Sequence, residues 1–120
     1  MEDSRSAKGA QAERAAAQFL EEQFSYRILE RNYRSRFGEV DLIAEEGDVL
    51  CFIEVRSRST SRYGEAIETI GREKRRRIAR SARQYLVTRN LEHRACRFDV
   101  VTLQSGQPPE LLRDAFDLDD

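Results

Sequence analysis

The stretch 39-EVDLIAEEGDVLCFIEVR-56 decides the fold of this chain. Two apolar runs, 39–44 and 49–56, flank a short acidic segment that contains a glycine. This pattern is typical of two antiparallel strands joined by a hairpin turn. Carboxylates stand inside both runs, although charged residues are rarely buried in a sheet. The segment therefore predicts both the centre of a sheet and a candidate functional site.

The expected register of this hairpin places Glu46 and Gly47 at the turn, so that Glu39 faces Glu54. Asp41 then lies diagonally across from Glu54 on the same face, about 7–8 Å away. Two carboxylates at that separation can share a divalent cation, whose oxygen ligands lie roughly 2–2.6 Å from the ion. Charged groups among apolar residues are costly unless they are paired or bind a metal ion. A metal site is therefore the leading interpretation.

Two simpler interpretations of the same carboxylates stay open at this point. Acidic side chains at the ends of strands are often solvated. Glu54 and Arg56, two residues apart on one face, can also form an ion pair with each other. Spacing alone does not separate these interpretations from a metal site, because perturbed charges mark function in only some proteins.

Length and composition predict a single domain over residues 1–120, with flexible tails at 1–6 and 117–120. The chain is 39% hydrophobic and 36% charged, and no apolar run approaches the roughly 20 residues of a membrane helix. The first eleven residues are polar and lack the apolar core of a signal peptide, so we expect a cytoplasmic protein without a membrane partner. Cys51 and Cys96 have no CxxC spacing, which predicts buried thiols rather than a disulfide or a zinc site.

The net charge of −1 conceals a strong asymmetry along the chain. Residues 56–97 hold 13 Lys and Arg against 4 Asp and Glu, so the remainder is acidic. A near-neutral total therefore does not argue against a nucleic-acid partner, because the basic charge is concentrated in one stretch.

The whole sequence predicts an α/β fold in which helices cover a mixed central sheet. A helix between the third and fourth strands fits a right-handed crossover, which makes those two strands parallel. The polar residues 57–71 include two glycines and predict a mobile loop. Besides the hairpin, the expected elements are helices at 7–24 and 72–88, strands at 26–33 and 97–103, and a short last element at 111–116.

The predicted helix at 72–88 carries a high concentration of positive charge. Like charges four residues apart destabilise an isolated helix by roughly 0.2–0.5 kcal/mol per pair, a cost that a polyanion removes by neutralising them. A solvated helix face is the simpler alternative. The clustering favours a phosphate-binding surface, which Arg58 and Arg62 of the preceding loop extend and which comprises Arg72, Lys74, Arg75, Arg76, Arg80 and Arg83.

Several segments taken together resemble the YraN family, a bacterial family of uncharacterised proteins similar to Holliday junction resolvases. The similarity runs from about Gly9 to Phe116, and it is the combination of segments that is specific. The resemblance implies a restriction-endonuclease-like fold of the PD-(D/E)XK nuclease superfamily. The matching segments include 28-ILERN-32, 38-GEVDLIA-44, 52-FIEVRSR-58 and 97-RFDVV-101.

The resemblance also implies roles for particular residues. Asp41 and Glu54 match the paired metal-binding acids of the nuclease motif, with Mg²⁺ or Mn²⁺ as the ion. Glu13 matches an additional acid that resolvase-like members supply from their first helix, although the residue by itself reads equally as an ordinary exposed glutamate. Arg56 departs from the superfamily pattern, which has a lysine there to position or activate the attacking water. Arginine stays protonated and cannot accept a proton, but it can stabilise negative charge on a phosphate.

These inferences predict a metal-dependent nuclease that acts on structured or branched DNA, with Asp41, Glu54, Arg56 and Glu13 as catalytic residues. One alternative is a nucleic-acid-binding protein that keeps the nuclease scaffold without turnover, which the arginine at position 56 favours. Another is a protein-interaction module. Resolvases of branched DNA usually act as symmetric dimers, so the resemblance also implies a homodimer.

Overall fold

The computed structural model describes residues 7–57 and 70–117. The expected loop at 57–71 therefore lies almost wholly outside the described residues, and Arg58 and Arg62 lie outside them as well. The helices are α1 (Ala7–Phe24) and α3 (Arg72–Thr88), and the strands are β1 (Arg27–Ser35), β2 (Gly38–Glu46), β3 (Val49–Ser57), β4 (Cys96–Leu103) and β5 (Glu110–Phe116).

One five-stranded mixed sheet forms the centre of the molecule, with its strands in the order β1-β2-β3-β4-β5. The strands β1, β2 and β3 are antiparallel neighbours, β3 and β4 run parallel, and β5 returns antiparallel to β4. The parallel step from β3 through α3 to β4 is the one that the sequence predicts. The result is the predicted α/β architecture, consistent with a restriction-endonuclease-like fold.

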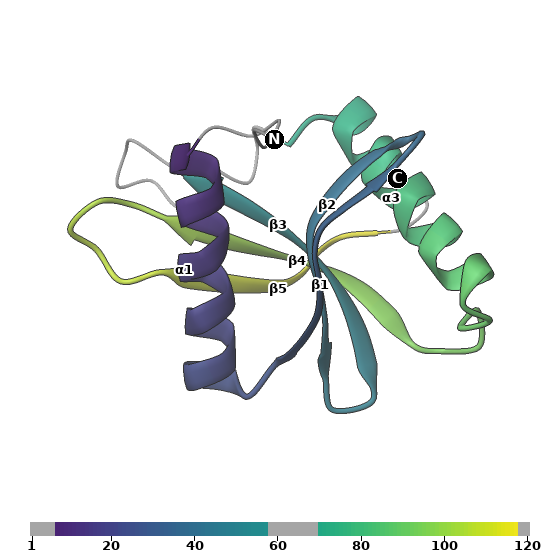
Figure 1. Ribbon diagram of the computed structural model, residues 1–120, viewed down its shortest axis with the longest axis horizontal. Helices are drawn as coiled ribbons and strands as arrows, with labels where there is room; N and C mark the ends of the chain where they lie inside the picture. Colours follow the sequence, from purple (N-terminus) through teal and green to yellow (C-terminus); the bar gives the residue numbers. More distant parts are fainter. Residues whose placement is uncertain (1–6, 58–69, 118–120) are drawn as a thin grey trace.

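The two helices cover opposite faces of the sheet (Figure 1). On one face, Ile78, Ala82, Tyr85 and Leu86 of α3 are buried as their helical spacing predicts. On the other face, Ala16, Ala17 and Leu20 of α1 pack against the sheet. Because the sheet is covered on both sides, residues 50–53 of β3 are all buried, which explains the continuous apolar run in the sequence.

The predicted elements agree closely with the observed ones. Both helices have the predicted bounds, and the strand ends differ from the predicted ends by one or two residues. The short last element is a strand. Cys51 is buried, Cys96 is partly buried, and both are free thiols. Within the described ranges, no helix is long and apolar enough to cross a membrane.

The turn of the β2–β3 hairpin differs from the predicted turn. Glu46 pairs with Val49, so the turn consists of Gly47 and Asp48. Gly47 has a φ of 59°, in the left-handed region that glycine adopts without steric cost. A glycine at the first of two turn positions is typical of a type II′ hairpin, and the local conformation thus favours this register.

The predicted pairing of Glu39 with Glu54 is therefore wrong. In the observed register Leu42 faces Ile53, so Asp41 and Glu54 are the next residues along the two strands. The residue opposite Glu54 changes from Glu39 to Asp41, a shift of two residues, and side chains alternate between faces with a period of two. Asp41 and Glu54 consequently remain on the same face of the sheet.

Candidate metal centre

A hollow of about 210 Å³ opens where the first turns of α3 pack against the start of β2. Gly38 permits this close approach, because a Cβ atom there would lie 3.2 Å from the Cβ of Arg77. Its φ of 147° is also one that glycine adopts more readily than other residues. The hollow is lined by Gly38, Glu39, Asp41, Glu54, Lys74, Arg77 and Ile78.

The structure brings the predicted pair, Asp41 and Glu54, into this hollow. Glu54 is only 4% exposed, although it is a charged residue in an apolar strand. Asp41 is partly buried, and its Oδ2 accepts a hydrogen bond of 2.8 Å from the backbone N–H of Val55. That bond holds the Asp41 carboxylate against the neighbouring strand, one residue from Glu54.

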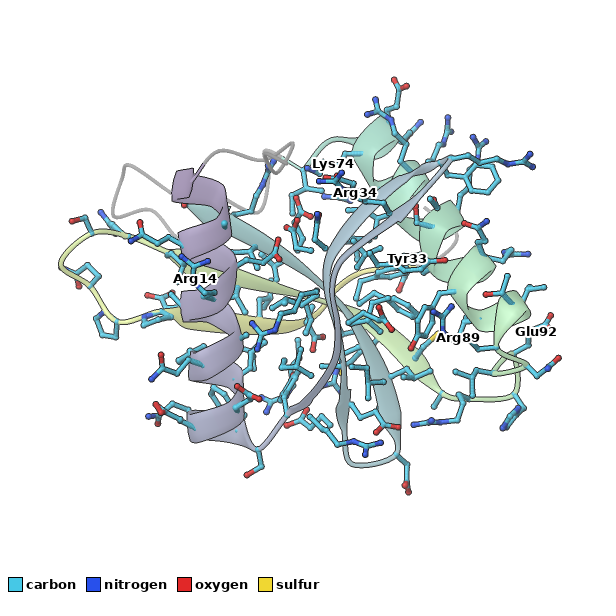
Figure 2. All side chains as sticks on the ribbon, in the orientation of Figure 1. Arg14, Tyr33, Arg34, Lys74, Arg89 and Glu92 are labelled. Atoms are coloured by element: carbon cyan, nitrogen blue, oxygen red, sulfur yellow. The ribbon has the colours of Figure 1, made fainter. Side chains whose placement is uncertain are left out.

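Two cations approach the Glu54 carboxylate. The Nζ of Lys74 lies 2.8 Å from the Oε2 of Glu54, whereas the Nη1 of Arg56 lies 3.8 Å from the same oxygen. Lys74 reaches the carboxylate from the first turn of α3, where Figure 2 labels it. The simple ion pair between Glu54 and Arg56 is thus present, but it is the longer of the two contacts.

The pKa of Asp41 is strongly raised. Burial, which disfavours the charged carboxylate, is the largest cause, and repulsion from Glu54 adds to it. The hydrogen bond from Val55 and the positive charge of Lys74 act in the opposite direction, and the net effect raises the pKa of Asp41 to about 7. A carboxyl group that exchanges its proton near neutral pH is frequent at functional sites.

A second buried carboxylate, that of Asp99 in β4, provides a contrast within the same protein. Asp99 is fully buried and accepts hydrogen bonds from the Oη of Tyr26 at 2.7 Å, the Nε of Arg97 at 2.9 Å and the backbone N–H of Asp114 at 3.0 Å. Both of its oxygens are satisfied inside the protein, as buried polar groups usually are. Asp41 instead shares its surroundings with a second carboxylate beside a hollow.

Glu13, the additional acid that the resemblance implies, lies in a different place. It is 5% exposed, so the reading as an ordinary exposed glutamate is wrong. It lines another hollow, of about 530 Å³, together with Arg14 and Arg31. In the part of the chain that the structure describes, no three Asp, Glu, His or Cys side chains gather where they could hold a metal ion. The described site therefore offers two carboxylates.

Two carboxylates suit a hard cation that keeps part of its water shell. Mg²⁺ is usually bound by one or two protein carboxylates, with waters and substrate phosphates completing its octahedral coordination. The raised pKa of Asp41 fits the same role, because a bound cation takes the place of the proton that this carboxylate otherwise binds near neutral pH.

Comparison with known proteins relates this geometry to a family. The model of the uncharacterised protein family UPF0102 matches residues 12–103. The chain belongs to this family. A UPF0102 protein of Syntrophus aciditrophicus is 45% identical over 113 residues, which cover 92% of this chain and 88% of that protein. A UPF0102 protein of Nitrosomonas europaea is 45% identical over 112 residues, with 92% and 93% covered. UPF0102 is the family that the resemblance above identifies as YraN.

In this UPF0102 chain, the cations of α3 fall into two groups. The first group contacts the protein itself. Lys74 binds Glu54, while the Nε of Arg75 donates to the carbonyl of Ile70 at 2.9 Å and its guanidinium lies 5.5 Å over the ring of Phe116. Arg77 belongs to this group as well, because it pairs with a glutamate one turn earlier.

The second group is exposed to solvent. Within the described ranges none of its members has a carboxylate partner. Their spacing of four, four and three residues places them on one side of the helix. We call this surface the arginine stripe, and it consists of Arg72, Arg76, Arg80 and Arg83.

The sequence predicts that Lys74 belongs to the phosphate-binding surface, and the structure places its side chain in the hollow with the carboxylates. Helix periodicity contained a signal for this difference. Lys74 lies four residues before the buried Ile78 and so shares a face with it, away from the arginine stripe. Periodicity does not tell which strand lies beneath that face, so the sequence did not reveal the contact with Glu54.

The raised pKa of Asp41 predicts a stability difference that depends on pH. A folded-state pKa near 7 means that the native protein holds a proton which the unfolded chain releases near pH 4. Stability is therefore lost as the pH rises from about 4 to 7 and stays lower above that range. Asp41→Asn keeps an acceptor for Val55 and does not ionise. We expect this variant to be more stable than the parent at pH 8 by on the order of 1–3 kcal/mol.

Urea unfolding in EDTA across pH 4 to 8 measures this difference, and the gain should vanish near pH 4. The control is Glu39→Gln, which removes an exposed carboxylate from the same hollow. An equal gain in unfolding free energy in both variants would contradict burial of Asp41 as the cause of the stability difference.

Proposed function

We propose that this UPF0102 protein hydrolyses phosphodiester bonds in structured or branched DNA, with Mg²⁺ or Mn²⁺ held by Asp41 and Glu54. The observation that carries the proposal is the pair of neighbouring carboxylates, one of them 4% exposed, beside a hollow. The likeness to resolvases supports DNA as the substrate. Because fold analogy is a weak warrant for function, the proposal rests chiefly on the site.

The residues of the hollow suit this chemistry. A divalent cation, when bound, would lower the pKa of a coordinated water and polarise the phosphoryl oxygen. Asp41 is fixed by the N–H of Val55 and is available in its charged form at and above about pH 7. Glu54 is held by its contact with Lys74, so both carboxylates are positioned before any ion arrives.

Lys74 and Arg56 supply positive charge beside the reacting phosphate. Arginine remains protonated, so Arg56 stabilises negative charge and does not handle protons. The ammonium group of Lys74 is a compact cation on a flexible stem, and it lies closer to Glu54 than Arg56 does. We assign to Lys74 the water-positioning role that the superfamily pattern gives to a lysine two residues after the glutamate.

The arginine stripe is the surface that we expect to bind the DNA backbone. Its guanidinium groups are exposed and have no carboxylate partner in the described part of the chain. Phosphate contacts of this kind fix the position of the protein on DNA without reading its sequence.

A cleavage panel of single-stranded, duplex and four-way-junction DNA with Mg²⁺ or Mn²⁺ tests the proposal. We expect cleavage that depends on the metal ion and that Asp41→Ala and Glu54→Gln each reduce by at least about 100-fold, as loss of a catalytic group commonly does. Glu39→Ala removes an exposed carboxylate of the same hollow and should retain activity. If the parent cleaves none of these substrates, the proposed hydrolysis is contradicted. The alternative, a DNA-binding protein without catalytic turnover, is then favoured.

The same assay separates the roles of the two cations. Lys74→Ala should lower cleavage by about 10²–10⁴-fold and leave the DNA affinity within about threefold. Adding Arg56→Lys to the Lys74→Ala variant should restore part of the activity, because a lysine then stands beside Glu54 from the strand. Full activity of Lys74→Ala, together with loss of activity in Arg56→Ala, would instead identify arginine as the essential cation.

The arginine stripe predicts a change in the salt dependence of DNA binding. Replacing Arg76, Arg80 and Arg83 together by alanine should weaken binding equally across sequences and reduce the salt slope by about one unit per lost phosphate contact. Arg14→Ala, an exposed arginine of α1 on the opposite side of the sheet, is the control. A triple variant with the slope of the parent would place the DNA on another surface.

A further inference from the structure

A third hollow, of about 370 Å³, lies where the turn of the β1–β2 hairpin meets the second half of α3. Figure 1 shows this end of the hairpin beside the helix. The hairpin contributes Arg36 and Phe37, which are its two turn residues. One side of the helix supplies the remaining lining, namely Arg80, Arg83, Gln84, Val87 and Thr88.

The walls of this hollow are fixed to each other. The hydroxyl groups of Ser35 in β1 and Ser81 in α3 share a hydrogen bond of 2.8 Å, and Ser81 is fully buried. The same Oγ of Ser35 accepts a hydrogen bond of 3.0 Å from the backbone N–H of Phe37. The hairpin turn is therefore held against the helix, so a ligand would enter a preformed space.

The lining combines apolar surface with positive charge. Val87 is 48% exposed, and among the residues that the structure describes it is the one large hydrophobic side chain with that exposure. The guanidinium of Arg36 lies 4.9 Å over the ring of Phe37, so a cation and an aromatic ring meet at the hairpin turn. Arg80 and Arg83 add two more cations, and none of the described residues that line the hollow is acidic.

Gln84 adds hydrogen-bonding capacity to this surface. Its Oε1 is buried and has no hydrogen-bond partner in the described part of the chain. An unsatisfied buried acceptor is costly, and a rotation of the amide would offer both a donor and an acceptor to a ligand. Nucleobase edges present the same combination of donors and acceptors.

We propose that this hollow binds an unpaired nucleobase of the DNA whose backbone lies along the arginine stripe. Unstacked bases bind to aromatic rings and to guanidinium planes, while neighbouring cations hold the phosphates. Three arginines around an apolar surface complement DNA, which combines negatively charged phosphates with flat apolar bases. A neutral or basic peptide segment would offer these arginines no negative charge to bind. The inference rests on the proposed function, and it names DNA with unpaired nucleotides as the preferred substrate class.

The distance between the hollow and the metal centre along α3 indicates how far apart the two sites would lie on a DNA strand. Lys74 and Gln84 are ten residues apart on α3, which corresponds to about 15 Å along the helix axis. Duplex DNA advances about 3.4 Å per nucleotide of each strand. The unpaired base would therefore lie roughly four nucleotides from the phosphate at the carboxylate pair.

Fluorescence anisotropy in EDTA tests this inference without any contribution from cleavage. The probes are a 20-base-pair duplex and the same duplex with a two-thymine bulge. We expect the parent to prefer the bulged probe, and we expect Phe37→Ala to lose at least about fivefold in affinity for the bulged probe alone. Phe37→Trp should keep the preference, because its ring also stacks. The control is Phe24→Ala, a partly buried phenylalanine of α1 on the other side of the sheet.

Three results would overturn the inference. One is a ratio of bulged-probe affinity to duplex affinity that is the same in the parent and in Phe37→Ala. Another is a parent that binds neither probe. The third is self-association, measured by sedimentation, that Phe37→Ala or Val87→Ser abolishes, because the hollow would then be a protein contact. Cleavage without a preference for the bulge would refute this inference alone, and a preference without cleavage would refute only the hydrolysis proposed above.

Discussion

The carboxylates of Asp41 and Glu54 lie together beneath the first turns of α3, although two negative charges repel each other. Contacts from the surrounding residues hold them in place. Glu54 stands in an apolar strand with 4% exposure, where a lone charge is costly. The ammonium of Lys74 offsets that charge from the helix, and the N–H of Val55 holds the Asp41 carboxylate from the strand. The contact of Lys74 depends on the close approach of α3 to β2 that Gly38 permits.

The two buried acidic sites of this protein differ in how many hydrogen-bond donors surround the carboxylate. Asp99 is surrounded by donors from Tyr26, Arg97 and Asp114 and so contributes to structure without an open ligand position. Asp41 has a single backbone donor and a neighbouring acid, and its pKa rises to about 7. The first arrangement is complete within the protein, while the second becomes favourable when a cation is added. This difference is the physical reason for proposing a metal centre at one site only.

Much of the fold could be predicted because hydrophobic periodicity reports it directly. The stripe of Ile78, Ala82, Tyr85 and Leu86 defines α3, and the unbroken apolar run of β3 indicates a strand that is covered on both faces. The turn at Gly47 was misplaced by one residue, because the φ that glycine adopts there selects the register and is not visible in the pattern of apolar residues.

The candidate site could be predicted only in part. The pairing of Asp41 with Glu54 follows from strand alternation, which tolerates the misplaced turn. The burial of Glu13 and the contact of Lys74 with Glu54 depend on how helices pack on the sheet, which spacing within one element does not encode. For the same reason, the hollow between the hairpin turn and α3 has no signature in either segment alone.

Calorimetric titration of the metal-free protein with Mn²⁺ at pH 7.5 tests the central claim most directly. The account predicts one site per chain in the parent and in Glu39→Ala, and no measurable site in Asp41→Ala or Glu54→Ala. Undiminished Mn²⁺ binding by both Asp41→Ala and Glu54→Ala, or a parent that binds no Mn²⁺ at all, would contradict it.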